Sequence, residues 1–141
     1  MRCALVIPSW SPEDIFPSKT AGSQINYWQP LGTLYVASSL INSGHDVIFL
    51  NGAFMSHAEI LNAISKYKPQ FTGIYSTAFG WNKAKQTADD INKIDRKIFV
   101  AVGGPYPIAM QEKCLEETES IDAVVTGEGE VTTAGMLDRL S

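Results

Sequence analysis

Short apolar runs alternate along the chain with longer segments in which apolar residues recur every three or four positions. The short runs occupy residues 3–7, 46–50, 71–75, 98–102 and 123–125. A continuous apolar run of this length is typical of a strand covered on both faces, whereas the wider spacing is typical of an amphipathic helix. The helical segments fall near residues 31–41, 56–64, 82–94 and 108–117, and a last one ends near residue 140. The pattern therefore predicts five strands, each followed by a helix.

Two of the predicted helices carry sequence signals at their ends. Ser56 and Glu59 form a capping-box pair, in which the serine hydroxyl accepts a hydrogen bond from the backbone N–H three residues later. Pro30 suits the start of the first helix, where no N–H is needed, and Gly44 suits the position just after its end. These boundaries lie next to predicted strands and support the alternating assignment.

Strands that alternate with helices pair in parallel, because each helix carries the chain back across the sheet in a right-handed crossover. We predict a single α/β domain over residues 1–141. Its fold is flavodoxin-like (Rossmann-like), a three-layer sandwich with a five-stranded parallel sheet in the order 2-1-3-4-5. Such sheets bind ligands outside the carboxyl ends of the strands, where the strand order reverses. The loops after strands 1, 3, 4 and 5 are therefore the candidate site.

The composition narrows the class of protein. The 141 residues carry 11 Lys and Arg against 15 Asp and Glu, which gives a net charge of −4 and a pI near 5.1. A mildly acidic domain is a poor match for nucleic acid, whose phosphates are bound by clustered cations. No apolar run approaches the roughly 20 residues needed to cross a bilayer, and the start of the chain lacks a secretory signal. We expect a soluble, cytoplasmic domain with no nucleic-acid partner and no membrane span.

Several ligands that this fold binds are excluded by the loops at the predicted site. A phosphoacceptor receiver domain requires an Asp at the end of strand 3, where residues 75–77 read Tyr-Ser-Thr. A flavodoxin requires a compact, hydroxyl-rich phosphate loop after strand 1, whereas the connection here is long, covers residues 8–29 and is interrupted by prolines. A dinucleotide fold requires Gly-x-Gly-x-x-Gly after strand 1. The Gly-Glu-Gly-Glu run at residues 127–130 follows the last strand instead, and its carboxylates would repel a pyrophosphate.

Three loops at this edge carry chemistry that a plain connection does not need. Ser76 and Thr77 place adjacent hydroxyls at the end of strand 3, where they can hydrogen-bond a ring nitrogen or an amide, or cap the next helix. The Gly-Gly pair at residues 103–104 permits a positive φ or the close approach of a flat group, or simply makes a tight turn. Glu128 lies between two glycines, and Glu130 is close enough to a helix start to be stabilised by the helix macrodipole. Together, the three loops indicate a ligand more strongly than any one of them.

The long connection after strand 1 is a further candidate. Loops of more than about 12–15 residues in a compact domain are usually functional or disordered. This one contains Trp10, Phe16, Tyr27 and Trp28, which argues against disorder. Its aromatic residues either cover a ligand or a partner domain, or form a locally packed surface loop.

The motifs form an ordered set that resembles one known family. They are Pro30-Leu31-Gly32, Ser43-Gly44-His45-Asp46-Val47, Lys68-Pro69-Gln70, Gly73-Ile74-Tyr75-Ser76-Thr77, Val102-Gly103-Gly104-Pro105 and Gly127-Glu128-Gly129-Glu130. Over essentially the whole chain they are similar to the N-terminal cobalamin-binding domain of B12-dependent radical SAM enzymes. That group includes methyltransferases and the anaerobic magnesium-protoporphyrin monomethyl ester cyclase type. The resemblance implies that the chain binds cobalamin and presents it to a C-terminal radical SAM domain for methyl transfer or radical cyclisation.

The resemblance also implies a position for each part of the cofactor. In the family, cobalamin lies over the carboxyl edge of the sheet, and its dimethylbenzimidazole tail inserts beside the sheet. The residues expected to line the tail are Ser76, Thr77, Gly103, Gly104 and Pro105; those expected to border the tail and the corrin amides are Thr126, Gly127, Glu128 and Gly129; and those expected near the corrin are Ser9 and Trp10. The strand-order argument selects this edge independently.

Histidine and cysteine separate this chain from other cobalamin and radical SAM proteins. Cobalamin domains of the methionine-synthase type carry Asp-x-His-x-x-Gly, whose His ligates cobalt, and this sequence lacks that motif. We expect His45 in a solvated turn at the opposite edge and His57 on the surface, so bound cobalamin should be base-off and His-off, with no metal ligand from the protein. The family's catalytic barrel binds a 4Fe-4S cluster through Cys-x-x-x-Cys-x-x-Cys and uses S-adenosylmethionine. Cys3 and Cys114 cannot supply three thiolates and suit buried structural thiols.

We therefore interpret residues 1–141 as a cobalamin-binding domain without catalytic residues, excised from a larger chain with a C-terminal radical SAM barrel or existing as a short homologue. The parent would be a methyltransferase or a cyclase. Two alternatives stay open. One is a cofactor-free flavodoxin-like interaction domain, which binding of cobalamin would exclude. The other is a self-sufficient small α/β enzyme, for which the sequence offers no nucleophile–base pair.

Overall fold

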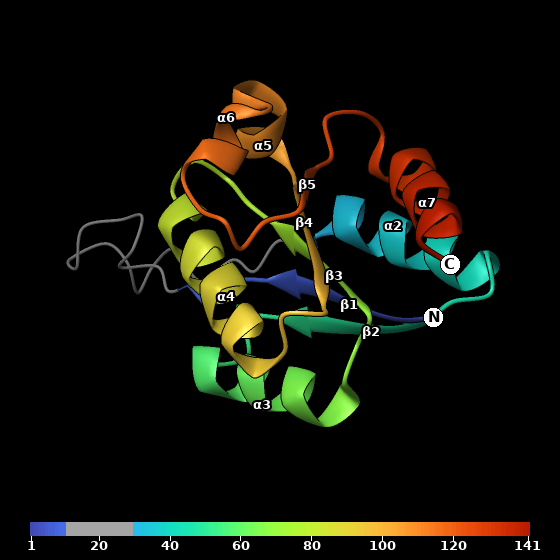
Figure 1. Cartoon of the computed structure of the whole chain (residues 1–141), viewed down its shortest axis with the longest axis horizontal. Coiled ribbons are helices and arrows are strands. Elements are labelled where there is room, and N and C mark those ends of the chain that lie inside the picture. The colour runs from blue at the N-terminus through green and yellow to red at the C-terminus, as the bar shows by residue number, and fades with distance from the viewer. Residues whose placement is uncertain (11–29) are drawn as a thin grey trace.

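The computed structural model describes residues 1–10 and 30–141. Its centre is a five-stranded parallel sheet in the order β2-β1-β3-β4-β5, which confirms the predicted α/β fold and strand order (Figure 1). The strands are β1 (Arg2–Ile7), β2 (Asp46–Asn51), β3 (Phe71–Tyr75), β4 (Phe99–Gly103) and β5 (Ala123–Val124). Because β1 pairs with both β2 and β3, the strand order reverses between β1 and β3. The carboxyl ends of these two strands form the edge where ligands bind in such sheets.

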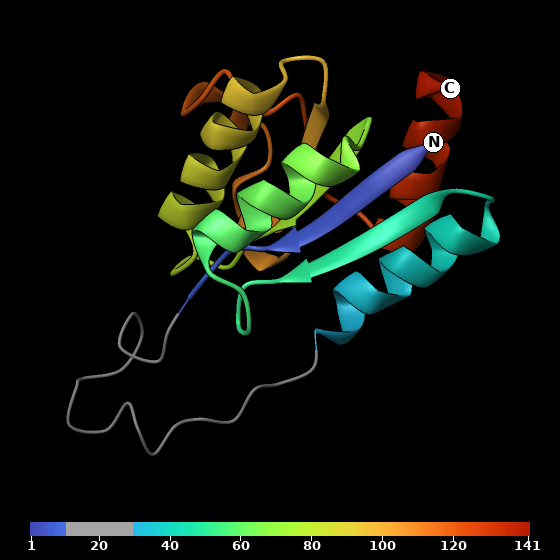
Figure 2. The same ribbon diagram turned by 90° about the horizontal axis from the view of Figure 1, so that it is seen from below.

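Helices cover both faces of the sheet, as a three-layer sandwich requires. The helices α2 (Leu31–Asn42) and α7 (Gly129–Leu140) lie side by side on one face, whereas α3 (His57–Tyr67) and α4 (Trp81–Ile94) lie on the other (Figures 1 and 2). Two short helices, α5 (Pro105–Met110) and α6 (Lys113–Glu116), follow β4. Within the described ranges, no helix is long and apolar enough to cross a membrane.

Side chains alternate between the two faces along each strand. In β3, Phe71 belongs to the core under α2 and α7, whereas Ile74 belongs to the core under α3 and α4. Gly73 and Tyr75 therefore share the face of Phe71, and Ser76 continues on the face of Ile74. This alternation decides which residues at the strand ends can reach a ligand on each face.

Helix boundaries follow the sequence signals where one residue enforces them. The Glu59 N–H donates to the Ser56 hydroxyl at 3.1 Å, which confirms the predicted cap of α3. Gly44 adopts a φ of +86° after α2, as expected for the residue that ends a helix. The single helix predicted near residues 108–117 is wrong: α5 and α6 replace it, because Gln111 turns the backbone to a φ of +50° between them.

Candidate functional site

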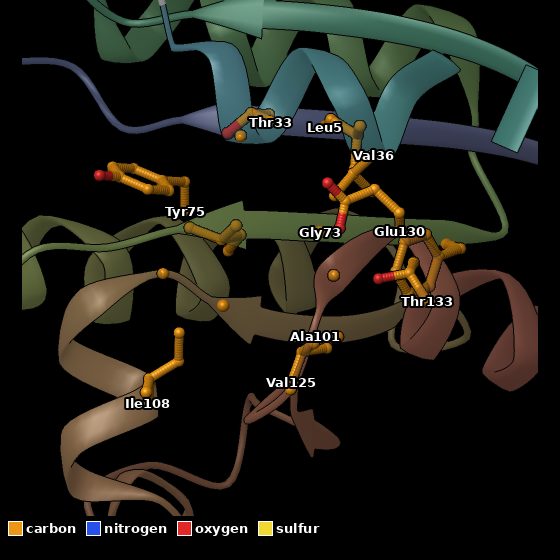
Figure 3. Close-up of a pocket in the computed structure, with 17 residues that line it drawn as sticks. Leu5, Thr33, Val36, Gly73, Tyr75, Ala101, Ile108, Val125, Glu130 and Thr133 are labelled. Carbon is orange, nitrogen blue, oxygen red and sulfur yellow. The ribbon is translucent and has the colours of Figure 1, made fainter. Parts of the chain in front are cut away.

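A slot of about 220 Å³ lies between the sheet and the helix pair α2/α7. Figure 3 shows Leu5 and Val36 on one side of this space, Ile108 and Val125 on the other, and Glu130 reaching in from α7. The lining combines apolar side chains with a small polar set. The glycines of the lining are Gly32, Gly73, Gly103, Gly104, Gly127 and Gly129, and its polar side chains are Thr33, Tyr75, Glu130 and Thr133.

Glycines make room for the slot where strands and helices would otherwise touch. A Cβ on Gly73 would lie 2.9 Å from Cδ2 of Leu5, and a Cβ on Gly129 would lie 2.8 Å from Cγ2 of Val36. Both distances are too short for packed carbon atoms, so a side chain at either position would force its neighbour to move. At these points the Leu5 and Val36 side chains, which line the slot, pack directly against glycine backbone.

Gly104 is required by both its conformation and its surroundings. Its φ is +107°, a region that other residues rarely adopt, and a Cβ there would lie 2.8 Å from the Ser76 carbonyl oxygen and 2.9 Å from the Tyr75 ring. The turn is locked by the Tyr106 N–H, which donates to the same Ser76 carbonyl at 3.2 Å. The positive φ that the Gly-Gly pair permits is therefore present, and it starts α5 beside the slot.

A second and larger cavity, of about 490 Å³, lies at the carboxyl ends of β1, β2 and β3, and we call it the edge hollow. Its lining is more polar than that of the slot and includes a cationic residue, Lys83. Tyr75 lines both cavities, so the slot and the edge hollow are neighbours at the end of β3. Other residues that line the edge hollow are Pro8, Ser9, Trp10, Asn51, Thr77, Phe79 and Asn82.

The residues predicted from the sequence divide between these two cavities and the surface around them. Gly103, Gly104, Gly127 and Gly129 line the slot, and Ser9, Trp10 and Thr77 line the edge hollow. Ser76, Pro105, Thr126 and Glu128 line neither cavity. Phe16, Tyr27 and Trp28, predicted to cover a ligand or a partner domain, lie outside the described residues.

The two hydroxyls after β3 have local partners. Ser76 is buried on the face of α3 and α4, and its hydroxyl donates to the Thr77 carbonyl at 2.9 Å. The Thr77 hydroxyl accepts from the Gly80 N–H at 3.2 Å, which is the capping role that was the alternative for these residues. Thr77 still borders the edge hollow, whereas the Ser76 side chain points away from the slot.

Sequence reasoning missed the polar residues of the slot. Thr33 and Val36 lie on one face of α2, and Glu130 and Thr133 lie on one face of α7, in each case three residues apart. That spacing is visible in the sequence, but it becomes informative only once α2 and α7 are known to be neighbours. The sequence predicts only a favourable position at the start of a helix for Glu130, whereas its side chain faces the slot (Figure 3).

Neither histidine lines the slot or the edge hollow. His45 lies at the opposite edge, where its Nδ1 is 3.3 Å from the amino group of Met1. His57 is not on the exposed surface as expected: its side chain is only 22% exposed, and its Nε2 lies 2.8 Å from a carboxylate oxygen of Asp90 on α4. Across residues 1–10 and 30–141, no group of three or more His, Cys, Asp or Glu side chains could hold a metal ion.

Both cysteines are buried structural thiols. Cys3 is fully inaccessible in the core under α2 and α7, and Cys114 is fully inaccessible in the other core. Burial raises the pKa of Cys3 to about 11 and also raises the pKa of Cys114. A thiol that stays protonated at neutral pH is a poor nucleophile and a poor metal ligand.

Comparison of the sequence with known families identifies the family of the domain that contains this slot. Residues 20–137 match the family model of the B12 binding domain. The chain belongs to the B12-binding domain family. The slot and the edge hollow of this B12-binding domain thus lie where the strand order predicts a ligand, in a family defined by cobalamin binding.

The curated relatives are longer proteins. The domain is 35% identical, over its full length, to an uncharacterized methyltransferase of Pyrococcus horikoshii, and covers 30% of that protein. Over 73% of its length it is 30% identical to the anaerobic magnesium-protoporphyrin IX monomethyl ester cyclase of Rubrivivax gelatinosus, and covers 19% of it. It is 28% identical to the hopanoid C-3 methylase of Methylococcus capsulatus over 80% of its length. The domain therefore spans less than a third of each relative.

A solved structure shares the fold. The methanol:cobalamin methyltransferase complex MtaBC from Methanosarcina barkeri superposes on 99% of this domain with a TM-score of 0.70 and 16% sequence identity. At that identity the likeness supports the fold, and it covers 45% of the solved chain.

Proposed function

We propose that this domain binds cobalamin with the dimethylbenzimidazole tail in the slot and the corrin over the carboxyl edge of the sheet. The size of the slot carries the proposal. A cavity of about 150 Å³ in another protein holds benzene, so a slot of about 220 Å³ suits a fused two-ring base and is too small for a corrin. Gly73 and Gly129 help to keep this space open for a flat ring, because a side chain at either position would displace Leu5 or Val36, which line the slot.

The edge hollow is the place that we propose for part of the corrin. Ser9, Thr77 and Asn82 provide hydroxyl and amide groups that can pair with the amide side chains of the macrocycle. Trp10 offers an aromatic face at the same cavity. Of the sequence-predicted residues, we keep Ser9, Trp10, Thr77, Gly103, Gly104, Gly127 and Gly129 as the proposed contacts.

We further propose that the cofactor is bound base-off and His-off. A tail held in the slot cannot reach back to its own cobalt. The domain has two histidines, and neither lines the slot or the edge hollow: His45 lies beside the amino terminus, and His57 is paired with Asp90. Because no histidine is in the described lining of the edge hollow, this domain would supply no imidazole ligand to the cobalt.

The relatives support a place for this domain in a longer protein. We propose that it is cytoplasmic and precedes a radical SAM domain, which would bind the 4Fe-4S cluster and S-adenosylmethionine and catalyse methyl transfer or cyclisation. The methyltransferase and cyclase names of the relatives, and the small share of each that this domain covers, support the proposal. Bound cobalamin would supply a cobalt that can accept and donate a methyl group, while the domain positions and shields it.

A desalting experiment tests the proposal. The purified chain is mixed with hydroxocobalamin, passed through a desalting column and scanned for absorbance. We expect about one coloured cofactor per chain, with the absorption spectrum of a base-off cobalamin. A colourless, correctly folded protein would refute the proposal and favour the cofactor-free interaction domain.

A further inference from the structure

Glu130 places an unpaired carboxylate in the slot. Its half-buried side chain extends from the first turn of α7 toward the space between α2 and β3 (Figure 3). Within the described part of the chain, no N–H or O–H group donates a hydrogen bond to this carboxylate. No Lys or Arg is among the described residues that line the slot. Residues 1–10 and 30–141 therefore offer no partner for the negative charge.

The remaining polar groups of the slot are few. Tyr75, at the end of β3, is the other titratable side chain of the lining, and Thr33 and Thr133 contribute hydroxyls from α2 and α7. The parts of the lining that belong to β1, β4 and α5 are apolar side chains or glycine. The neighbouring Glu128 is exposed and lies outside the lining. Among the described residues that line the slot, Glu130 is thus the one that carries a carboxylate.

A ring that fills the slot would strip water from Glu130. An ionised carboxylate in apolar surroundings is costly unless a donor replaces the lost water. When the tail is off the cobalt, one nitrogen of the dimethylbenzimidazole ring is free. That nitrogen carries a lone pair and no proton. Carboxylate and lone pair repel each other unless one proton lies between them. We propose that the tail binds together with one proton, shared between the Glu130 carboxylate and the free ring nitrogen.

The step is a simple proton uptake. Solvent or buffer supplies one proton, which adds to a lone pair of either partner, and no bond between heavy atoms forms or breaks. The number of protons taken up is one whether the proton lies on the carboxylate or on the nitrogen, because the pair titrates as a unit. The inference rests on the proposed function and extends it to the protonation state of the bound tail.

Calorimetry measures this proton directly. Cobalamin binding is titrated at about pH 6.5 in two buffers that differ in ionisation enthalpy, and the difference in heat gives the number of protons taken up. We expect about one proton per site for the wild-type chain. Because the complex holds a proton that the free partners lack, Kd should rise by up to about tenfold per pH unit between the pKa of the free partners and the higher pKa of the shared pair in the complex.

Two variants and a second ligand sharpen the test. In Glu130→Gln the amide can donate to the unprotonated nitrogen, so uptake should fall close to zero and Kd should lose its pH dependence. Asp138→Asn, on an exposed position of the same helix, is the matched control and should keep the uptake. Cobinamide, which lacks the tail, should bind without proton uptake.

The outcomes separate this inference from the proposed function. Cobalamin binding without proton uptake in the wild-type chain would overturn the inference and leave the proposed function standing, with a hydroxyl of Thr33, Tyr75 or Thr133 as the donor. Unchanged uptake in a folded Glu130→Gln variant would also overturn the inference. No binding of cobalamin at all would refute both, and equal affinity for cobinamide and cobalamin would show that the tail does not enter the slot.

Discussion

Replacing Gly103 by Val should close the slot to the tail while leaving the fold intact. A Cβ at this position would lie 3.6 Å from the Cβ of Val125, an ordinary contact, and its φ is not in the left-handed region. Strand alternation directs a side chain at 103 to the same face as Ala101, toward α2 and α7. Three added carbons, each roughly the 30 Å³ of a water molecule, would leave roughly 130 Å³ of the slot, less than the cavity of about 150 Å³ that holds benzene.

The loss of affinity follows from the size of the excluded ring. At about 0.3 kcal/mol per non-hydrogen atom, a base of about ten such atoms contributes about 3 kcal/mol, or more than 100-fold in Kd. The assay is an absorbance titration with cobalamin and with cobinamide, together with the Tm of each variant. Cobinamide affinity should hardly change, and the Tm of Gly103→Val should equal or exceed that of wild type, because Val is favoured in strands.

The adjacent glycine provides the contrast. Gly104→Val combines a φ of +107° with a Cβ 2.8 Å from the Ser76 carbonyl oxygen, so this variant should lose thermal stability before any ligand is added. If Gly103→Val had a native Tm and wild-type affinity for cobalamin, the tail could not occupy the slot, and the reasoning from cavity volume would be refuted.

Three further predictions concern stability and activity. The Thr72 hydroxyl is fully buried without a described partner, so Thr72→Val should raise the free energy of unfolding in urea by about 1 kcal/mol; a destabilised variant would mean that a partner exists. Hydrogen bonds from Lys93 and from His57 hold the pKa of Asp90 below its usual range, so Asp90 stabilises the fold above about pH 4 and loses this contribution as pH falls through the lowered pKa. Scans of Tm from neutral to acid pH should therefore show a smaller acid-induced drop for Asp90→Asn, and an unchanged drop would contradict the assignment. The chain alone, reconstituted with iron and sulfide, should form no 5′-deoxyadenosine from S-adenosylmethionine; detection of that product would contradict the placement of the cluster in another domain.

The sheet could be predicted from the sequence because its signals are local and repeated. Each apolar run specifies one strand, and the helix between successive strands forces parallel pairing, so the order follows from general rules of chain connection. The glycines of the site could also be found, since a positive φ or a lack of room for a side chain leaves a glycine in the sequence. Gly104 combines both of these reasons.

The features of the site that could not be predicted from the sequence depend on where a strand ends and on which elements become neighbours. The hydroxyl of Ser76 predicts a ligand contact, but β3 keeps its alternation to the end and turns Tyr75, not Ser76, toward the slot. Glu130 faces a ligand site only because α7 packs beside α2, a contact between distant parts of the chain. His57 is half-buried because Asp90, 33 residues away, accepts its hydrogen bond. Such long-range pairings have no local sequence signal.

Electron paramagnetic resonance of the Co(II) form of cobalamin bound to this chain tests the central claim most directly. With the tail in the slot and both histidines held elsewhere, no nitrogen should ligate the cobalt, so the spectrum should show cobalt hyperfine lines without nitrogen superhyperfine splitting. A nitrogen splitting that persists in the bound state would contradict the account. Its loss in His45→Ala or His57→Ala would identify a protein ligand, and its persistence in both would show that the cofactor keeps its own base on the cobalt.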